Sequence, residues 1–233
     1  MSKPTIGIVS GYTSHNTVEL ISGGASYFDL LEKLIDEAKE TIHIQIYIYE
    51  ADETGERVTR ALVRAAQRGV NVYLLLDGYA SRRLSPDLLD TIRKSGVHFR
   101  WFEPLFKSSR FYIGRRMHHK VVVVDGFYSL VGGINISNHY NDLPNYPAWL
   151  DWAAYVKGDV SIELHNICVR RWFKEIHPSA LRVAIRSHSN DSAECNIRVR
   201  INDWVRNQNQ ISRSYLEMFH RAQTQVTIMS SYF

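Results

Sequence analysis

The 233-residue chain contains little cysteine and no long uninterrupted apolar run. Its two cysteines, Cys168 and Cys195, lie far apart, with no CxxC spacing and no histidine set near either. Such spacing argues against both a disulfide framework and a zinc site. We therefore expect both thiols to be buried and unpaired.

The sequence also lacks a segment of the roughly 18 to 20 apolar residues that a membrane-spanning helix needs. Its start, "MSKPTIGIVSG", has neither the charged beginning nor the long apolar middle of a signal peptide. The formal net charge of +4 at pH 7 favours an anionic partner, such as nucleic acid, phospholipid or a phosphorylated substrate, without choosing among them. We expect a cytoplasmic protein that can lie against a membrane.

Hydrophobic periodicity alternates between helices and strands along most of the chain. Apolar residues recur at helical spacing in 30–38, and residues 41–50 then alternate with period two. The same succession returns in 56–77 and again in 85–102. Helices that alternate with short apolar strands predict an α/β protein whose sheet is covered on both faces.

The periodicity stops at residues 103–117, which contain aromatic and basic side chains without a regular pattern. We expect a loop bordering a site there. Beyond it, the pattern predicts strands at 120–125 and 127–133 around an Asp-Gly turn, and an amphipathic segment at 160–173.

The C-terminal stretch "ISRSYLEMFHRAQTQVTIMSSYF" resembles "YFDLLEKLIDEAKETIHIQIYIYE" shifted by 184 positions. Ala222 then falls on Ala38, and Val226 falls on Ile42. The pattern predicts a helix followed by a strand, as at the start of a second copy of the domain. Any amphipathic helix followed by a strand would look similar, so the repeat alone leaves both interpretations open.

Two histidines and a lysine precede the four valines of the predicted strand in "MHHKVVVVD". In a strand His118 and Lys120 share a face, while His119 points to the other. An imidazole can attack phosphorus, and a lysine together with the amide of Asn135 can hold the non-bridging oxygens as charge builds on them. Taken alone, a histidine and a lysine at the solvent end of a strand are far more typical of an ordinary surface.

A longer pattern surrounds this pair. Six positions fit the spacing HxK(x)4D(x)6GGxN: His118, Lys120, Asp125, Gly132, Gly133 and Asn135. This spacing resembles the signature of the phospholipase D superfamily. The segments "LLLDGYAS", "FRWFEP", "RRMHHKVVVVDG" and "LVGGINIS" are similar to bacterial cardiolipin synthases, and the resemblance covers roughly residues 18–169 plus the C-terminal stretch.

The resemblance implies a phospholipase D-like mixed sheet with helices on both faces. Residues 1–190 would form the first such domain, and residues 191–233 the beginning of a truncated second domain. The chemistry it implies is phosphatidyl transfer through a phosphohistidine, without a metal or other cofactor. His118 would be the nucleophile, Lys120 and Asn135 would bind phosphate, and Gly133 would allow close approach of the backbone.

Four further side chains receive expected roles. Family members place an acidic residue about thirty positions after the histidine to orient its imidazole, and Asp151 stands at that place. Asp125, whose strand parity is opposite, is expected to fix the turn and the local geometry. Arg115 and Arg116 adjoin the motif, where they would contact phosphate or lipid headgroups, although solvated loop arginines would look the same.

Enzymes of this superfamily carry two such motifs, and the repeat offset would put the second histidine near position 302, since 118 + 184 = 302. The chain therefore resembles a partial enzyme that needs its missing second half or a second copy. The leading hypothesis is a cardiolipin synthase-type phosphatidyltransferase that joins two phosphatidylglycerols, or similar anionic phospholipids, at the cytoplasmic membrane surface.

Two alternatives stay open. One is a homodimeric phosphodiesterase or nuclease that uses two copies of His118. Nucleic acid is not favoured as the partner, because basic and aromatic residues are not interleaved as in a nucleic-acid groove. The other is a non-catalytic remnant that binds anionic lipid or partner proteins only.

Overall fold

The computed structural model describes residues 8–9, 11–103, 116–173, 194–203 and 208–228. The chain divides into two compact units, residues 1–197 and residues 198–233. The first unit contains one nine-stranded sheet. Its strands are β1 (Ile8–Val9), β2 (Tyr12–Ser22), β3 (Thr41–Ile46), β4 (Asn71–Asp77), β5 (His98–Phe102), β6 (Lys120–Val124), β7 (Tyr128–Gly132), β8 (Trp152–Gly158) and β9 (Cys195–Ile197). Its helices are α1 (Ala25–Glu37), α2 (Glu53–Gln67), α3 (Pro86–Lys94) and α4 (Val160–Trp172), with a 3-10 turn η1 at Asn138–Tyr140.

The sheet is mixed, with the strand order β1-β2-β8-β7-β6-β3-β4-β5, and β9 also pairs with β2. Strands β3, β4 and β5 run parallel to one another. Strand β6 pairs antiparallel with β3, and β7, β8 and β2 continue the sheet in antiparallel fashion. The predicted mixed sheet is therefore confirmed.

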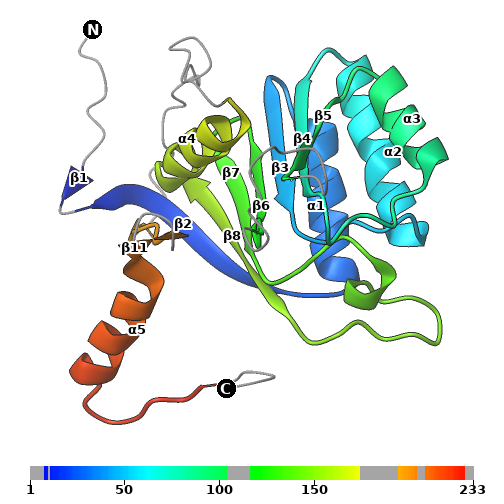
Figure 1. Cartoon of the computed structure of the whole chain (residues 1–233). Coiled ribbons are helices and arrows are strands. Elements are labelled where there is room, and N and C mark those ends of the chain that lie inside the picture. Colours follow the sequence, from blue (N-terminus) through cyan, green and yellow to red (C-terminus); the bar gives the residue numbers. More distant parts are fainter. Residues whose placement is uncertain (1–7, 10, 104–115, 174–193, 204–207, 229–233) are drawn as a thin grey trace, which may run out of the picture. The chain divides into compact units, whose positions relative to one another are not determined.

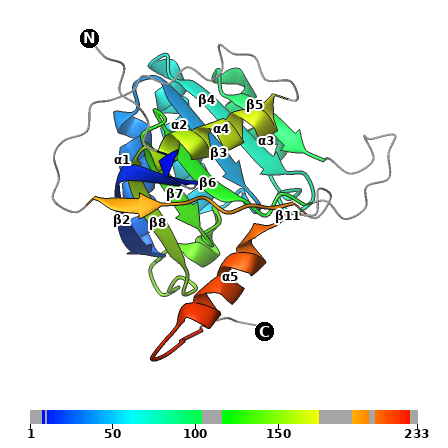
Figure 2. The ribbon, with the colours of Figure 1, turned by 90° about the vertical axis from the view of Figure 1, so that its left-hand side faces the viewer.

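Helices cover both faces of this sheet, as predicted. Helices α1, α2 and α3 lie on one face and α4 lies on the other (Figures 1 and 2). On the first face Ile42, Ile44 and Ile46 of β3 are fully buried in the main apolar core. On the α4 face the same strand buries His43 and Gln45, and the Gln45 amide donates to the carbonyl oxygen of Cys168 in α4. Strand β3 therefore has an apolar side and a polar side, and both are covered.

Local signals explain where the helices begin. The Asp52 carboxylate caps α2 by accepting a hydrogen bond from Gly55 N. Ser85 caps α3 in the same way, with Pro86 at the first helical position. Gly55 is required for a second reason, because a Cβ atom there would lie 1.9 Å from the Glu50 carbonyl oxygen.

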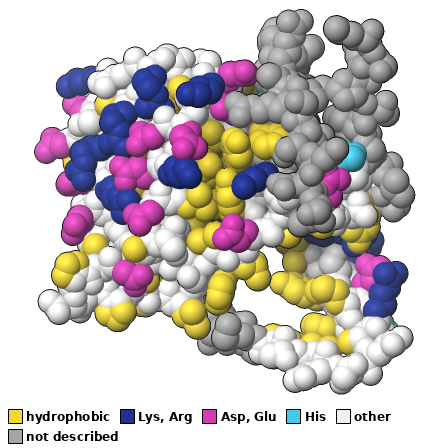
Figure 3. Space-filling model, turned by 180° about the vertical axis from the view of Figure 1, so that it is seen from behind, with side chains coloured by type: hydrophobic (Ala, Val, Ile, Leu, Met, Phe, Trp, Pro, Cys, Tyr) yellow, Lys and Arg dark blue, Asp and Glu magenta, His cyan; other side chains and the backbone are white. Residues whose placement is uncertain are grey.

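Basic and acidic side chains are interspersed over the surface of α1 and α2 (Figure 3). Arg57 of α2 pairs with Asp29 and Glu32 of α1, each at 2.7 Å. Arg64 pairs with Glu32 and Asp36, each at 2.8 Å. These pairs lie at the rim of the helix–helix contact, where each is worth about 1 kcal/mol or less.

Two strands differ from what the hydrophobic periodicity predicts. The period-two run was expected to continue through Ile48, but β3 ends at Ile46, and Tyr49 forms only an isolated bridge with Ile136. Strand β2, 11 residues long, was not anticipated. Its pattern is weak because the outer part of the strand is largely exposed, so polar residues are tolerated there.

Asp125 directly follows β6 and has a left-handed conformation, with φ of 51°. Its carboxylate accepts hydrogen bonds from the backbone N–H groups of Lys39, Glu40 and Thr41, where the chain enters β3. The side chain thus ties the end of β6 to the beginning of β3, which is its antiparallel partner.

The second unit contains β10 (Asn202–Asp203), β11 (Gln208–Asn209) and α5 (Gln210–Arg221). The helix expected near the C-terminus is present. The strand expected after it is not formed by residues 225–228, because in the described part of the chain no neighbouring strand pairs with them. The rest of that predicted strand, residues 229–233, and the predicted boundary at 190/191 lie outside the described residues.

Two further expectations concern the burial of the cysteines and the presence of a membrane-spanning helix. Cys168 is buried and Cys195 is half-buried, and both are unpaired. Among the described helices, none combines the length and the apolar character required to cross a bilayer.

We predict that Asp125→Ala lowers the free energy of unfolding by about 2 to 4 kcal/mol, because it leaves several backbone donors without their charged acceptor. Urea unfolding followed by circular dichroism measures this change. Asp36→Ala, which removes an exposed carboxylate paired with Arg64, is the control and should cost about 1 kcal/mol or less. Equal effects of the two substitutions would contradict the structural role of Asp125.

Candidate active site

The HxK segment lies at the edge of the sheet where β3 and β4 end. Lys120, the first residue of β6, is paired with Ile46, the last residue of β3. His118 precedes the strand and is exposed, whereas Lys120 is 7% exposed. The antiparallel pairing thus places the start of β6 beside the carboxyl ends of the parallel strands.

His118 and Lys120 are in direct contact. The Lys120 Nζ atom lies 3.2 Å from each ring nitrogen of His118, so the ammonium faces the imidazole and can donate to its unprotonated nitrogen. The ring of Tyr47 packs against both groups, with its centroid 4.6 Å from that of His118 and 5.0 Å from Lys120 Nζ. Tyr47 was not singled out from the sequence, where it is one of several aromatics in a strand-like run.

Burial and charge keep the imidazole neutral. The pKa of His118 is lowered mainly by partial desolvation of its ring, although the residue as a whole is exposed, and further by the charge of Lys120, while Asp77 acts in the opposite direction. Burial also lowers the pKa of Lys120 to about 8, opposed by the charge of Asp151. At neutral pH the site therefore combines a neutral imidazole, which can act as a nucleophile, with an ammonium group.

Asp151 lies against Gly133, the second glycine of the motif. A Cβ atom on Gly133 would come within 2.1 Å of Asp151 Oδ1, so the carboxylate occupies the space that a side chain would fill. Asp151 Oδ1 also accepts a hydrogen bond from Trp152 N. None of the hydrogen bonds between described residues joins Asp151 to His118, so its expected role in orienting the imidazole stays a prediction.

Asn135 is 2% exposed, and its amide is already engaged. Its Oδ1 atom accepts from Ile48 N, and its Nδ2 atom donates to the hydroxyl of Tyr140. These bonds hold the chain that follows β3 against the chain that follows β7. Contact of Asn135 with phosphate stays a prediction.

The three remaining residues predicted for the site do not all lie beside His118. Asp125 lies at the opposite end of β6 from Lys120, away from the imidazole. Arg116 lies beside the HxK segment, with its guanidinium over the ring of Tyr79. Arg115, together with most of the predicted site-bordering loop, lies outside the described residues.

Asp77 is the main site residue that the sequence reasoning missed. It is fully buried at the end of β4 and accepts hydrogen bonds from the backbone N–H groups of Tyr79, Ala80 and Met117. The residue before His118 is thereby attached to β4. An acidic residue that ends the apolar run "VNVYLLLD" was the signal that could have identified it.

His119 faces away from the site, as expected from strand parity. Its Nδ1 atom lies 2.9 Å from the Gln45 side-chain oxygen, on the α4 side of the sheet. Burial lowers its pKa to about 4, with a further contribution from Arg171. His119 is therefore neutral and packed.

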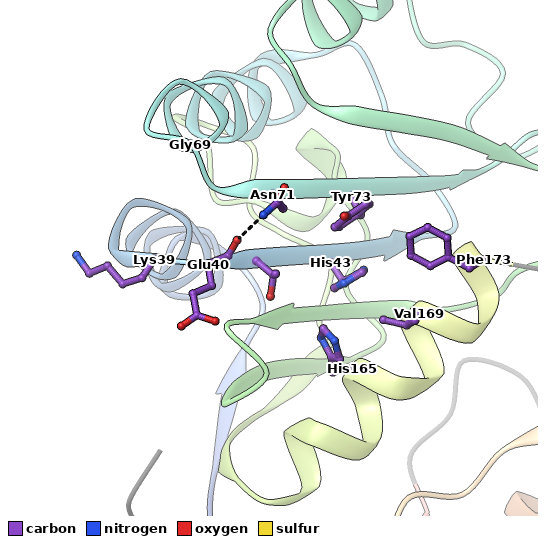
Figure 4. Close-up of a pocket in the computed structure, with 10 residues that line it drawn as sticks. Lys39, Glu40, His43, Gly69, Asn71, Tyr73, His165, Val169 and Phe173 are labelled. Carbon is purple, nitrogen blue, oxygen red and sulfur yellow. Dashed lines mark hydrogen bonds between the residues drawn. The ribbon is translucent and has the colours of Figure 1, made fainter. Parts of the chain in front are cut away.

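A separate cavity of about 490 Å³ lies at the other end of β3, between the sheet and α4 (Figure 4). His43, Tyr73 and His165 are among the residues that line it. Burial lowers the pKa of His43 to about 3, with an added effect of His165. In the described part of the chain, histidine, cysteine and acidic side chains form no group of three or more that could hold a metal ion.

Known proteins resemble this chain in both sequence and structure. The family described as "Cardiolipin synthase, PLD-like domain" matches residues 31–145. Cardiolipin synthase B of Shigella flexneri is 32% identical over 94% of this chain and 54% of that protein. The major cardiolipin synthase ClsA of Bacillus subtilis is 28% identical over 95% of this chain and 47% of that protein. The chain thus spans about half the length of these relatives.

Two solved structures share the fold. A phospholipase D family member, Nuc from Salmonella typhimurium, aligns with a TM-score of 0.53 and 20% identity over 79% of this chain and 99% of Nuc. The phosphatidylserine synthase of Haemophilus influenzae aligns with a TM-score of 0.54 and 17% identity over 88% of this chain and 44% of that chain. The resemblance drawn from the HxK motif is confirmed, and residues 31–145, which contain that motif, match the phospholipase D-like domain of the cardiolipin synthases.

Proposed function

We propose that this chain supplies one catalytic half-site of a phosphatidyltransferase that acts on phosphatidylglycerol or a similar anionic phospholipid. The observation that carries this proposal is the neutral, exposed imidazole of His118 in contact with the Lys120 ammonium. A neutral imidazole is the nucleophilic form, and a cation beside it stabilises the charge that develops on a phosphoryl group.

The reaction proceeds in two steps. A His118 ring nitrogen attacks phosphorus, the P–O bond to the glycerol headgroup breaks, and glycerol leaves with a proton from a general acid. The hydroxyl of a second lipid then gives its proton to the same group and attacks the phosphohistidine. The P–N bond breaks, and the imidazole is restored.

The general acid comes from outside the HxK segment of this chain, which contains that motif once. In this proposal a second motif provides it, either in another copy of the chain or in a further segment. General acid–base assistance contributes about 10² to 10⁴ in rate. A single half-site is therefore expected to form the covalent intermediate slowly.

Contact with the membrane belongs to the same proposal. Trp149, Leu150 and Trp152 flank Asp151 and are 55%, 73% and 44% exposed. Trp149 is held in place by stacking on the ring of His139, at 4.5 Å between centroids. Exposed aromatic and apolar side chains at the rim of a lipid-acting site suit the interfacial region of a bilayer.

We predict a covalent adduct on His118. Incubation of the full chain with dihexanoylphosphatidylglycerol should raise its intact mass by one phosphatidyl group, detected by mass spectrometry of acid-free samples. The adduct should be absent from His118→Asn and present in His98→Asn, which removes an exposed imidazole on β5. An adduct that persists in His118→Asn would contradict the nucleophile. Nicking of plasmid DNA that depends on His118, without any lipid adduct, would favour a nuclease instead.

The rate of adduct formation should fall on the alkaline side near pH 8, where buried Lys120 loses its proton. Asp151→Asn should move this fall to lower pH, because the Asp151 charge raises the pKa of Lys120. Lys120→Arg should abolish the fall, since guanidinium stays charged. Rates measured from pH 6 to pH 10, which brackets the Lys120 pKa of about 8, test the fall in the parent and in both variants. An unchanged alkaline fall in Lys120→Arg would exclude Lys120 as the group that causes it.

Leu150→Ser should weaken binding to phosphatidylglycerol vesicles by roughly tenfold, because it removes an apolar side chain worth about 1.5 kcal/mol or more when buried. Vesicle flotation measures the bound fraction. Leu216→Ser changes a leucine of α5 that is 56% exposed, and it serves as the control. Equal losses in the two variants would contradict a membrane contact specific to the rim of the site.

A further inference from the structure

Two arginines share one aromatic ring beside the HxK segment. The guanidinium carbon of Arg82 lies 4.7 Å from the centroid of the Tyr79 ring, and that of Arg116 lies 4.6 Å from it. Tyr79 is 41% exposed, so the cluster of Tyr79, Arg82 and Arg116 is open to solvent. Contact with the π face favours each cation, but the two positive charges repel each other.

The surroundings of these arginines differ from those of the arginines on α2. Arg57 and Arg64 are neutralised by carboxylates of α1. For Arg82 and Arg116, no carboxylate oxygen among the described residues lies within salt-bridge distance. Within the described part of the chain their planar N–H groups are therefore available to an anion. Both guanidinium carbons lie within 4.7 Å of one ring centroid, so an anion bound beside them would offset their repulsion.

Asp77 connects this cluster to the reactive imidazole. One carboxylate oxygen of Asp77 accepts from Tyr79 N, and the other accepts from Met117 N, the residue between Arg116 and His118. Asp77 also acts electrostatically on His118. The cluster thus lies next to the nucleophile, on the β4 side of the sheet edge, and is distinct from Lys120.

We propose that Arg82 and Arg116, held by Tyr79, form a second phosphate site that binds the phosphodiester of the acceptor phospholipid. This inference rests on the proposed function. When a phosphatidyl group passes to the headgroup hydroxyl of a second phosphatidylglycerol, two phosphodiester anions come within one glycerol of each other. Lys120 serves the reacting phosphate, and the two arginines hold the other, which offsets its repulsion from the first.

Specificity follows from this arrangement. An acceptor that carries its own phosphate gains two guanidinium contacts, whereas a neutral alcohol such as free glycerol gains none. The cluster would therefore select an anionic lipid as acceptor over a water-soluble alcohol.

The first test is binding, which does not require turnover. Isothermal titration of dihexanoylphosphatidylglycerol into the full chain is carried out in the Lys120→Met background, which weakens the first phosphate site. Arg82→Gln should raise the Kd by about tenfold, the effect typical of one charge-assisted hydrogen bond. Arg83→Gln removes the same charge from the exposed neighbouring residue, which contacts no ring among the described ones, and should change the Kd less than twofold. Equal losses in the two variants would overturn the proposal.

The tyrosine gives an independent test. Tyr79→Phe keeps the ring and should bind like the parent, whereas Tyr79→Leu removes it and should resemble Arg82→Gln. If Tyr79→Phe and Tyr79→Leu bind equally well, the ring does not position the arginines and the proposal fails.

Two further experiments distinguish a lipid phosphate from a nucleic-acid phosphate as the ligand. The Kd of a thymidine oligonucleotide should be similar for the Arg82→Gln and Arg83→Gln variants. A weaker oligonucleotide affinity in Arg82→Gln alone would assign the site to nucleic acid instead. In turnover, Arg82→Gln should lower the rate of transfer to phosphatidylglycerol about tenfold relative to the rate of transfer to labelled glycerol. Equal slowing of both transfers would overturn the acceptor role. Absence of all transfer would refute the proposed function, while the titrations still decide the second phosphate site.

Discussion

Strand β3 forms parallel hydrogen bonds with β4 on one edge and antiparallel hydrogen bonds with β6 on the other. The site exists because of this change of direction. In an all-parallel sheet the head of β6 would lie at the opposite edge from the ends of β3 and β4. Here the pairing of Lys120 with Ile46 brings the HxK segment to the edge where Tyr47 follows β3 and Asp77 ends β4. Asp125 secures the same junction at its far end, through backbone donors at the start of β3.

The cationic side chains of the candidate site lie in surroundings that would favour contact with phosphate. Burial destabilises the charge on Lys120, and the nearby charge of Asp151 partly restores it. Tyr47 contacts both Lys120 and His118, which limits their movement relative to each other. At the other side of the imidazole, Asp77 accepts three backbone hydrogen bonds and so holds the turn with Tyr79 close to the segment with Arg116. Asp151 thus acts on the charge of Lys120, whereas Asp77 holds the backbone on either side of the arginine cluster.

Several features could be predicted because they depend on local pattern. The burial of Ile42, Ile44 and Ile46 follows from period-two alternation, and most of the helix at 53–67 follows from apolar spacing in the stretch that begins at residue 56. Strand parity alone separates His118 and Lys120 from His119. The long strand β2 could not be anticipated, since its stability comes from pairing with β8, which is more than a hundred positions away in the sequence. For Asp77 the sequence offers a position, the acid that ends an apolar run, but not its hydrogen-bond donors, which the fold brings from Tyr79, Ala80 and Met117.

The sequence by itself determined the kind of chemistry available, since the spacing of histidine, lysine, glycines and asparagine is a property of the chain. It also determined the α/β class, because apolar periodicity is local. The tertiary structure decided which groups act on each other. Burial of Lys120, the contact of Asp151 with Gly133 and the sharing of Tyr79 by Arg82 and Arg116 all join segments distant in sequence. Electrostatic interactions depend on distance and burial, and neither is fixed until the sheet has formed.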